Sequence, residues 1–124
     1  MVKNIDKLLD GLSKTKFRGS FHLNSKMKDY VKEKGFTKIQ SDARDLIIKR
    51  IASANPNNDG FQTPMKQVHP VFIAQHATAT CCRGCLNKWY KIEKNRLLTN
   101  HEIDFCVALI MTWIKKELKE LDCN

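Results

Sequence analysis

Hydrophobic residues recur at the three- and four-residue spacing of α-helices along most of this chain. At residues 4–13, one amphipathic stripe is formed by Ile5, Leu8, Leu9 and Leu12. The polar stretch at residues 13–24 lacks this period but still carries Phe17, Phe21 and Leu23. We therefore expect an N-terminal helix, followed by a basic arm that packs against the core in an extended form.

Two further helices are predicted before residue 55. The first runs from Ser25 to Lys34, and its apolar face is formed by Met27, Tyr30, Val31 and the stem of Lys34. Gly35 follows as a natural left-handed C-cap, because glycine adopts a positive φ without strain. The next helix is expected to begin at Thr37, in a capping box with Gln40, and to end near Ala54. Its buried stripe consists of Ile39, Ala43, Leu46, Ile47 and Ile51.

The second half of the chain predicts two short helices and one long helix. Pro70 suits the first position of a helix that has His69 at its N-cap. Residues 81–90 give a second short helix, with a stripe of Cys82, Leu86 and Trp89. The long helix begins in a capping box at residues 99–102 and is apolar on nearly every side from 103 to 114. Its stripe consists of Ile103, Val107, Ile110, Ile114 and Leu121.

No segment alternates long enough with the period of two that a half-buried β-strand requires. The pattern therefore predicts an all-α fold, a compact bundle of about five helices around a buried C-terminal helix. With 124 residues, of which 42% are hydrophobic, the chain suits a single domain, 1–124, with one modest core. Residues 1–24 would form the N-terminal helix and basic arm. Residues 25–124 would form the helical core, with a Cys/His segment at 67–90.

Composition limits the compartment and the cysteine chemistry. The N-terminal sequence MVKNIDKLLDGLSK lacks the apolar run of a signal peptide, and the uncharged run at 105–114 is too short to cross a bilayer. We therefore expect a cytoplasmic protein without a membrane partner. Five cysteines, an odd number, argue against a disulfide framework and leave metal ligands, reactive thiols or buried thiols.

Positive charge is concentrated in the first half of the chain. The net charge is +9, and residues 1–50 carry 13 of the 22 basic residues but only 6 of the 13 acidic ones. Such a surface attracts polyanions, so nucleic acid or another protein is a candidate partner. A solvated lysine-rich surface is the simpler alternative, and the oligomeric state stays open. The candidate nucleic-acid-binding residues are Lys26, Lys28, Lys32, Lys38, Arg44, Lys49 and Arg50.

Residues 67–82, QVHPVFIAQHATATCC, contain no Lys, Arg, Asp or Glu in a chain that is 28% charged. This stretch continues into CCRGCLNKWY at residues 81–90. Two of the four histidines and three of the five cysteines therefore lie between His69 and Cys85. A segment whose polar residues are mainly His, Cys, Thr and Gln indicates a site rather than a plain core element.

The first interpretation of this segment is a metal site. Cys82 and Cys85 have the CxxC spacing that presents two thiolates on one helical turn. His69 and His76 are seven residues apart and would share a helix face. The predicted ligands are therefore His69, His76, Cys82 and Cys85, with Cys81 as a substitute. The mixture of nitrogen and sulfur donors favours zinc as the cofactor.

Two alternatives stay open for the same residues. An enzyme would use Cys81 or Cys82 as nucleophile and His76 as base, with loop 55–64 covering the site. The helix N-terminus and the adjacent Arg83 would favour the thiolate. The other alternative is a non-catalytic interaction protein with an apolar Cys/His core. Buried thiols are expected at Cys106 and Cys123, core anchors at Trp89 and Trp113, and a surface position for His22.

Known cysteine motifs narrow these possibilities. Covalent haem attachment needs CxxCH, but Leu86 follows Cys85. The upstream HxE of zinc deaminases is absent, because Ala77 and Thr78 follow His76. An iron–sulfur cluster usually needs four thiolates, and only three cysteines are close together in the sequence.

The strings HPVFIAQHATATCCRGCL and LTNHEIDFCVALIMTWI resemble a bacterial and phage family known only as domain of unknown function 4186. The resemblance covers most of the chain from Phe17 onward. It implies a small cytoplasmic protein and brings no established activity. The family motif often ends in KWH, whereas Tyr90 stands at that position in this chain, so the resemblance supplies no further histidine ligand here.

Overall fold

The computed structural model describes residues 4–55 and 63–122, with side chains up to Lys119. Every regular element in those ranges is helical, so the predicted all-α fold is confirmed. Three expectations lie outside the described residues: most of loop 55–64, the thiol of Cys123 and the side chain of Leu121. The helices are α1 (Ile5–Ser13), a short 3-10 helix η1 (Arg18–Ser20), α2 (Ser25–Lys34), α3 (Phe36–Arg50), α4 (Pro70–Ala77), α5 (Arg83–Tyr90) and α6 (Asn100–Asp122).

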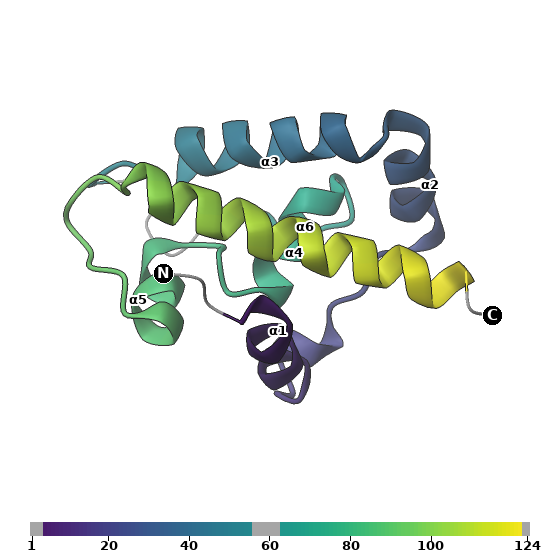
Figure 1. Cartoon of the computed structure of the whole chain (residues 1–124), viewed down its shortest axis with the longest axis horizontal. Helices are drawn as coiled ribbons and strands as arrows, with labels where there is room; N and C mark the ends of the chain where they lie inside the picture. Colours follow the sequence, from purple (N-terminus) through teal and green to yellow (C-terminus); the bar gives the residue numbers. More distant parts are fainter. Residues whose placement is uncertain (1–3, 56–62, 123–124) are drawn as a thin grey trace.

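Helix α6 is the centre of the packing, as its apolar sequence predicted. It crosses the middle of the molecule, with α3 on one side, α1 on the other and α4 behind it (Figure 1). Leu109, Ile110 and Ile114 on α6 are fully buried. A helix that contacts several neighbours needs apolar residues around most of its circumference, which explains the nearly continuous apolar run. No helix in the described part of the chain is long and apolar enough to span a membrane.

Side-chain caps begin several of the helices. The capping box of α6 is formed as predicted: Glu102 N–H donates to Thr99 Oγ1 at 3.1 Å, and Thr99 N–H donates to Glu102 Oε1 at 2.9 Å. Asn4 and Asn24 cap α1 and α2 in the simpler way, each accepting from a backbone N–H three residues later. These caps satisfy N–H groups that have no partner inside the helix.

The boundaries of α3 differ from the prediction at both ends. The helix begins at Phe36 rather than Thr37, and the predicted capping box of Thr37 and Gln40 is wrong. Gly35 alone joins α2 to α3 with φ of +83°, so the residue before the first turn has no side chain with which to cap it. The helix ends at Arg50, four residues before the predicted end. Positive φ at Gly35 was predicted correctly, but its ψ of 155° is extended rather than left-handed helical.

Two other expectations were wrong. The basic arm is compact rather than extended, because tight turns and η1 fold it back against α1 and α4. Phe21 then stacks on His76 with ring centroids 5.3 Å apart, while Leu23 is buried. Trp89 was expected in the core but is 36% exposed, since it lies on the outer face of α5. Trp113 is partly buried and packs against the core.

Candidate metal centre

The turn between α4 and α5 brings the cysteines together. Thr78 Oγ1 donates to the Ala74 carbonyl at 2.8 Å, and Tyr90 Oη donates to the Thr78 carbonyl at 2.5 Å. Ala79 has a φ of +59°, an uncommon conformation for alanine that reverses the chain at this point. Cys81 and Cys82 directly precede α5, and Cys85 lies in its first turn. Tyr90 thus has a structural role, because its hydroxyl binds the backbone of this turn.

Three thiols form a cluster at the start of α5. The Sγ of Cys85 lies 3.3 Å from the Sγ of Cys82 and 3.5 Å from that of Cys81, and all three sulfur atoms lie within 4.8 Å of one another. Cys82 is the N-cap residue, and its Sγ accepts from the Cys85 N–H at 3.4 Å. These sulfur–sulfur distances are far longer than a disulfide bond, and the thiols are free. Within the described residues, this is the cluster of ligand atoms suited to a metal ion.

An arginine from the N-terminal arm contacts this cluster. Arg18 Nη2 donates to Cys85 Sγ at 3.0 Å, and Nη1 contacts Cys81 Sγ at 3.5 Å. Nη1 also donates to the His76 carbonyl at 2.8 Å, which fixes the guanidinium against the end of α4. Because the arm is folded and η1 begins at Arg18, the Arg18 guanidinium lies against the sulfur atoms of the cluster.

The thiols share protons unequally. Hydrogen bonds from Cys81 and Cys82 lower the pKa of Cys85 far below its ordinary value; burial opposes them, and Arg18 lowers it further. The pKa of Cys81 is raised by its hydrogen bonds to Cys82 and Cys85 and by burial. For Cys82, the bond to Cys81 lowers the pKa, but the bond to Cys85 and burial outweigh it. The first negative charge of the cluster therefore resides on Cys85.

His76 lies beside the cluster without belonging to it. Its Nε2 is 3.0 Å from the Thr63 carbonyl and 3.1 Å from the Pro64 carbonyl. Carbonyl oxygens only accept hydrogen bonds, so Nε2 carries the proton and, in the neutral ring, Nδ1 keeps its lone pair. Burial lowers the pKa of His76, although both carbonyl contacts oppose this, so the neutral form is favoured at neutral pH. The described part of the chain shows no hydrogen bond from the His76 ring to Cys81 or Cys82.

His69 is held at the other end of α4. It is the N-cap residue, as predicted, and its Nδ1 accepts from the Val71 N–H at 3.1 Å. Its Nε2 donates to Asp42 Oδ2 at 3.3 Å, so both ring nitrogens have partners. Seven residues of helix correspond to about 10 Å along the axis. A shared helix face therefore does not bring His69 and His76 to one ion, and the structure gathers only Cys81, Cys82 and Cys85 of the five candidates.

Arg83 does not have the role expected from its position beside Cys82. Its side chain is 1% exposed and points away from the thiols. Nη1 donates to the Ser53 carbonyl at 2.8 Å, and Nη2 donates to the Glu93 carbonyl at 2.6 Å. Longer contacts reach the carbonyls of Ile51 and Ala52. The guanidinium therefore supplies hydrogen-bond donors to backbone carbonyls at the C-terminal end of α3. The positive charge at the thiols comes from Arg18 instead.

Sequence reasoning missed Arg18. It lies 67 positions from Cys85 in a polar stretch without helical period, and nothing local distinguishes it from the neighbouring basic residues. The available signal was that Phe17 and Phe21, two apolar residues in an otherwise polar segment, flank it. Phe21 packs on His76 and thereby holds the arm beside the cluster.

The candidate nucleic-acid residues are distributed over two helices. Lys26, Lys28 and Lys32 lie on α2, and the other four lie on α3. Some are engaged within the chain: Lys38 pairs with Asp42 at 2.8 Å and Arg44 pairs with Asp104. The guanidinium of Arg50 lies 5.3 Å from the centroid of the Phe72 ring. Nucleic-acid binding stays a prediction.

The fold and the site together define a small all-α protein with a three-thiol cluster at a helix N-terminus, contacted by an arginine. The sequence matches the model of a family described as "Domain of unknown function (DUF4186)" over residues 6–115, and the chain belongs to that family. No solved structure matches the chain.

Proposed function

We propose that this protein binds a metal ion, zinc, through Cys81, Cys82 and Cys85. The single observation that supports the proposal best is the convergence of the three sulfur atoms within 4.8 Å of one another. Three thiols this close are chemically unfavourable as an ionised group unless a cation lies among them. A bound ion would replace the protons of Cys81 and Cys82 and bring all three sulfurs into its first coordination sphere.

The charge around the cluster supports a divalent ion. Three thiolates and one divalent cation carry one net negative charge, which the Arg18 guanidinium would neutralise. With a monovalent ion such as Cu(I), a second negative charge would remain in a site where Cys81 and Cys82 are buried. Hydrogen bonds from Arg18 to the sulfurs are also the type of outer contact that orients metal ligands.

Zinc in a protein site usually has four ligands. We propose that His76 Nδ1 or a water molecule fills the fourth position. The contacts of His76 Nε2 to two backbone carbonyls match the usual arrangement of a metal-binding histidine, whose second nitrogen donates to a neighbour. His69, the other histidine of the sequence prediction, is committed to Asp42 and is left out of the proposed set.

Elemental analysis tests the proposal directly. Protein purified under reducing conditions, without added metal or chelator, should contain close to one zinc per chain. Cys85→Ser should lose the metal, and Cys106→Ala should keep it, because Cys106 is fully buried in α6 away from the cluster. His76→Ala should bind zinc more weakly, whereas His69→Ala should not. Absence of metal from the unmodified protein would reject the proposal.

A second candidate function is favoured by the hydrogen bond from Arg18 to Cys85. Cys85 accepts hydrogen bonds from the Arg18 guanidinium and from the thiols of Cys81 and Cys82, so its thiolate is the most stabilised of the three. Cys85 is therefore the best candidate nucleophile of the cluster. In this alternative the nucleophile is Cys85 instead of the predicted Cys81 or Cys82, and Arg18 instead of the predicted Arg83 stabilises its thiolate. Metal-free reduced protein should then show one thiol that is alkylated much faster than the others. Uniformly slow alkylation would count against this alternative.

A further inference from the structure

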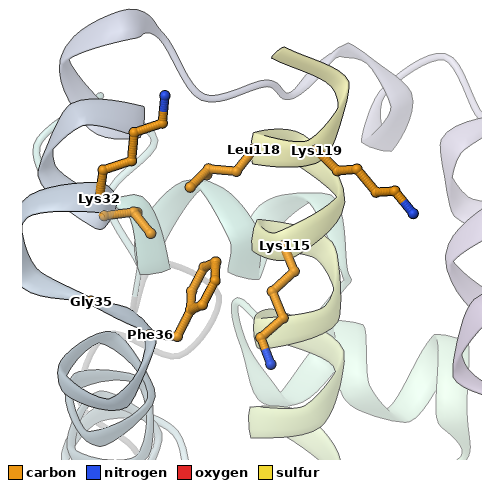
Figure 2. A pocket seen from close by; sticks show the side chains of 7 residues that line it. Lys32, Gly35, Phe36, Lys115, Leu118 and Lys119 are labelled. Carbon is orange, nitrogen blue, oxygen red and sulfur yellow. The ribbon is translucent and has the colours of Figure 1, made fainter. Parts of the chain in front are cut away.

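A groove lies on the opposite side of the fold from α5, between the corner of α2 and α3 and the C-terminal half of α6 (Figure 2). Its volume is about 570 Å³. This lies within the range of roughly 300–1,000 Å³ typical of small-molecule sites. The residues that line it include Val31, Lys32, Phe36, Lys115, Leu118 and Lys119.

The floor of the groove is apolar and includes an exposed aromatic ring. Val31 and Leu118 are buried beneath it, whereas Phe36 is 41% exposed. Figure 2 shows Phe36 and Leu118 projecting into the same space from α3 and α6. The position of Phe36 at the groove follows from Gly35. The positive φ of Gly35 turns the chain from α2 into α3 without an intervening loop. The first side chain of α3 therefore faces the groove rather than the interior.

The rim of the groove is positively charged. It carries three lysines, Lys32 from α2 and Lys115 and Lys119 from α6, and no residue described as lining the groove is acidic. Lys115 Nζ lies 5.3 Å from the centroid of the Phe36 ring. In Figure 2 the amino groups project outward from the apolar floor. Each lysine ends in a flexible four-carbon stem, so its amino group can turn toward an anion bound at the edge.

We propose that this groove binds a small anionic amphiphile, a molecule with one apolar chain or ring and a carboxylate or phosphate head. The apolar part would lie on Phe36 and Leu118, and the head group would contact Lys115 and Lys119. The groove is complementary to both parts of such a ligand. Its apolar floor would shield the apolar part of the ligand from water, and the lysines of its rim carry the charge opposite to that of the head group. The site is separate from the thiol cluster and does not depend on its occupant.

Decanoate is a suitable probe, used below the concentration at which it forms micelles. NMR titration of the full chain should show saturable shifts at Phe36 and Leu118, with a dissociation constant of about 1 mM or lower. Decanol, which has the same chain length without the charge, should bind more weakly. The double variant Lys115→Gln/Lys119→Gln should weaken decanoate binding roughly three- to tenfold. Lys116→Gln is the matched control, because Lys116 lies on the same helix but pairs with Asp6 at 3.0 Å.

Several results would overturn the proposal. They are the absence of saturable shifts, equal binding of decanol and decanoate, and an equal effect of the Lys116 control and the double variant. Phe36→Ala gives a separate test: it should reduce decanoate binding while leaving the fold intact, since the ring is partly exposed. A concentration-dependent dimer that masks Phe36, or an acidic helical peptide that displaces decanoate and binds far more tightly, would assign the groove to a protein partner instead.

Discussion

Arg18 Nη2 donates a hydrogen bond to Cys85 Sγ at 3.0 Å, joining two residues that are 67 positions apart in the chain. This contact closes the N-terminal arm over the start of α5. It places a permanent positive charge beside the most acidic thiol of the cluster. The chemistry of the site therefore depends on a segment that contributes no thiol to it.

Replacing Arg18 should make Cys85 less acidic. In metal-free reduced protein, we expect Arg18→Gln to move the midpoint of Cys85 alkylation to higher pH, because the thiolate loses a charge-assisted hydrogen bond. Arg18→Lys should have a smaller effect, since it keeps the charge but not the two-pronged contact. Mass spectrometry of iodoacetamide-treated protein measures the site and rate. Arg44→Gln, whose arginine pairs with Asp104, is the control; an identical pH profile in Arg18→Gln would contradict the expectation.

Arg83 should be among the most important polar residues for stability. Arg83→Met keeps much of the buried stem but removes the donors to the Ser53 and Glu93 carbonyls. We expect a loss of about 3 kcal/mol in the free energy of unfolding, because two part-buried carbonyls lose the charged donors of a buried guanidinium. Urea denaturation measures this loss. Arg44→Met removes a solvent-exposed ion pair and should cost less than about 1 kcal/mol; equal losses would show that the buried contacts of Arg83 are not special.

Glu102 should make the stability of the protein depend on pH in the acid range. The two nitrogen donors of Arg96, at 2.8 and 2.7 Å, lower the pKa of Glu102 to about 2, although partial burial opposes this. A folded-state pKa below the unfolded one means that the unfolded chain binds the proton first, so the stabilisation is present above the unfolded value. It is lost as the pH falls from about 4.5 toward 2.

Glu102→Gln tests this pH dependence. At pH 7, the variant should be less stable than the unmodified protein by up to about 1 kcal/mol, because glutamine can still accept from the Thr99 N–H but loses the ion pair with Arg96. The difference should shrink as the pH falls through the same range, as measured by thermal unfolding at a series of pH values. Glu33→Gln, which changes an exposed carboxylate on α2, controls for the general loss of negative charge. A pH-independent difference at Glu102 would contradict the assignment.

Metal removal should destabilise the protein if zinc occupies the cluster. The ion would connect the α4–α5 turn to α5, and a ligand that binds only the folded state raises the melting temperature. A chelator should therefore lower the melting temperature of the unmodified protein and of Cys106→Ala. Cys85→Ser, which cannot complete the site, should not respond. A similar response in Cys85→Ser would place the metal elsewhere.

Nucleic-acid binding through the first half of the chain should depend steeply on salt. Contacts to phosphates release counterions, so the affinity for a DNA duplex should fall sharply between about 50 and 200 mM salt. Lys26→Gln/Lys28→Gln on α2 should weaken binding, and Lys88→Gln on α5 should not. Fluorescence anisotropy measures both effects. No binding at low salt would dismiss nucleic acid as a partner.

The sequence alone determined most of the secondary structure. Residue types with strong local preferences defined the helix starts at Asn100 and Pro70, where Thr99 and His69 form the N-caps. The apolar run of α6 predicted its central position because a helix that is hydrophobic on all sides has to be surrounded. The predicted capping box at Thr37 was wrong, because Gly35 joins α2 directly to α3 and is itself the N-cap residue of α3.

The candidate site was predicted only in part, because bringing ligands together is a question of distance in three dimensions. The CxxC spacing identified Cys82 and Cys85 correctly as neighbours, since one helical turn determines their separation. The same periodicity grouped His69 with His76, although the rise of the helix separates them. Arg83 was expected beside the thiols on sequence adjacency, but its side chain turns to the end of α3.

What the sequence determined by itself were the helices, the central place of α6 and the segment that holds the cysteines, because each follows from interactions within a few residues. Tertiary structure decided which side chains meet: Arg18 rather than Arg83 at the thiols, and Cys81 rather than His69 in the cluster. The physical reason is that these contacts depend on how the arm and α4 pack. Packing is set by the summed burial of many apolar residues far apart in the chain, and no local pattern encodes it.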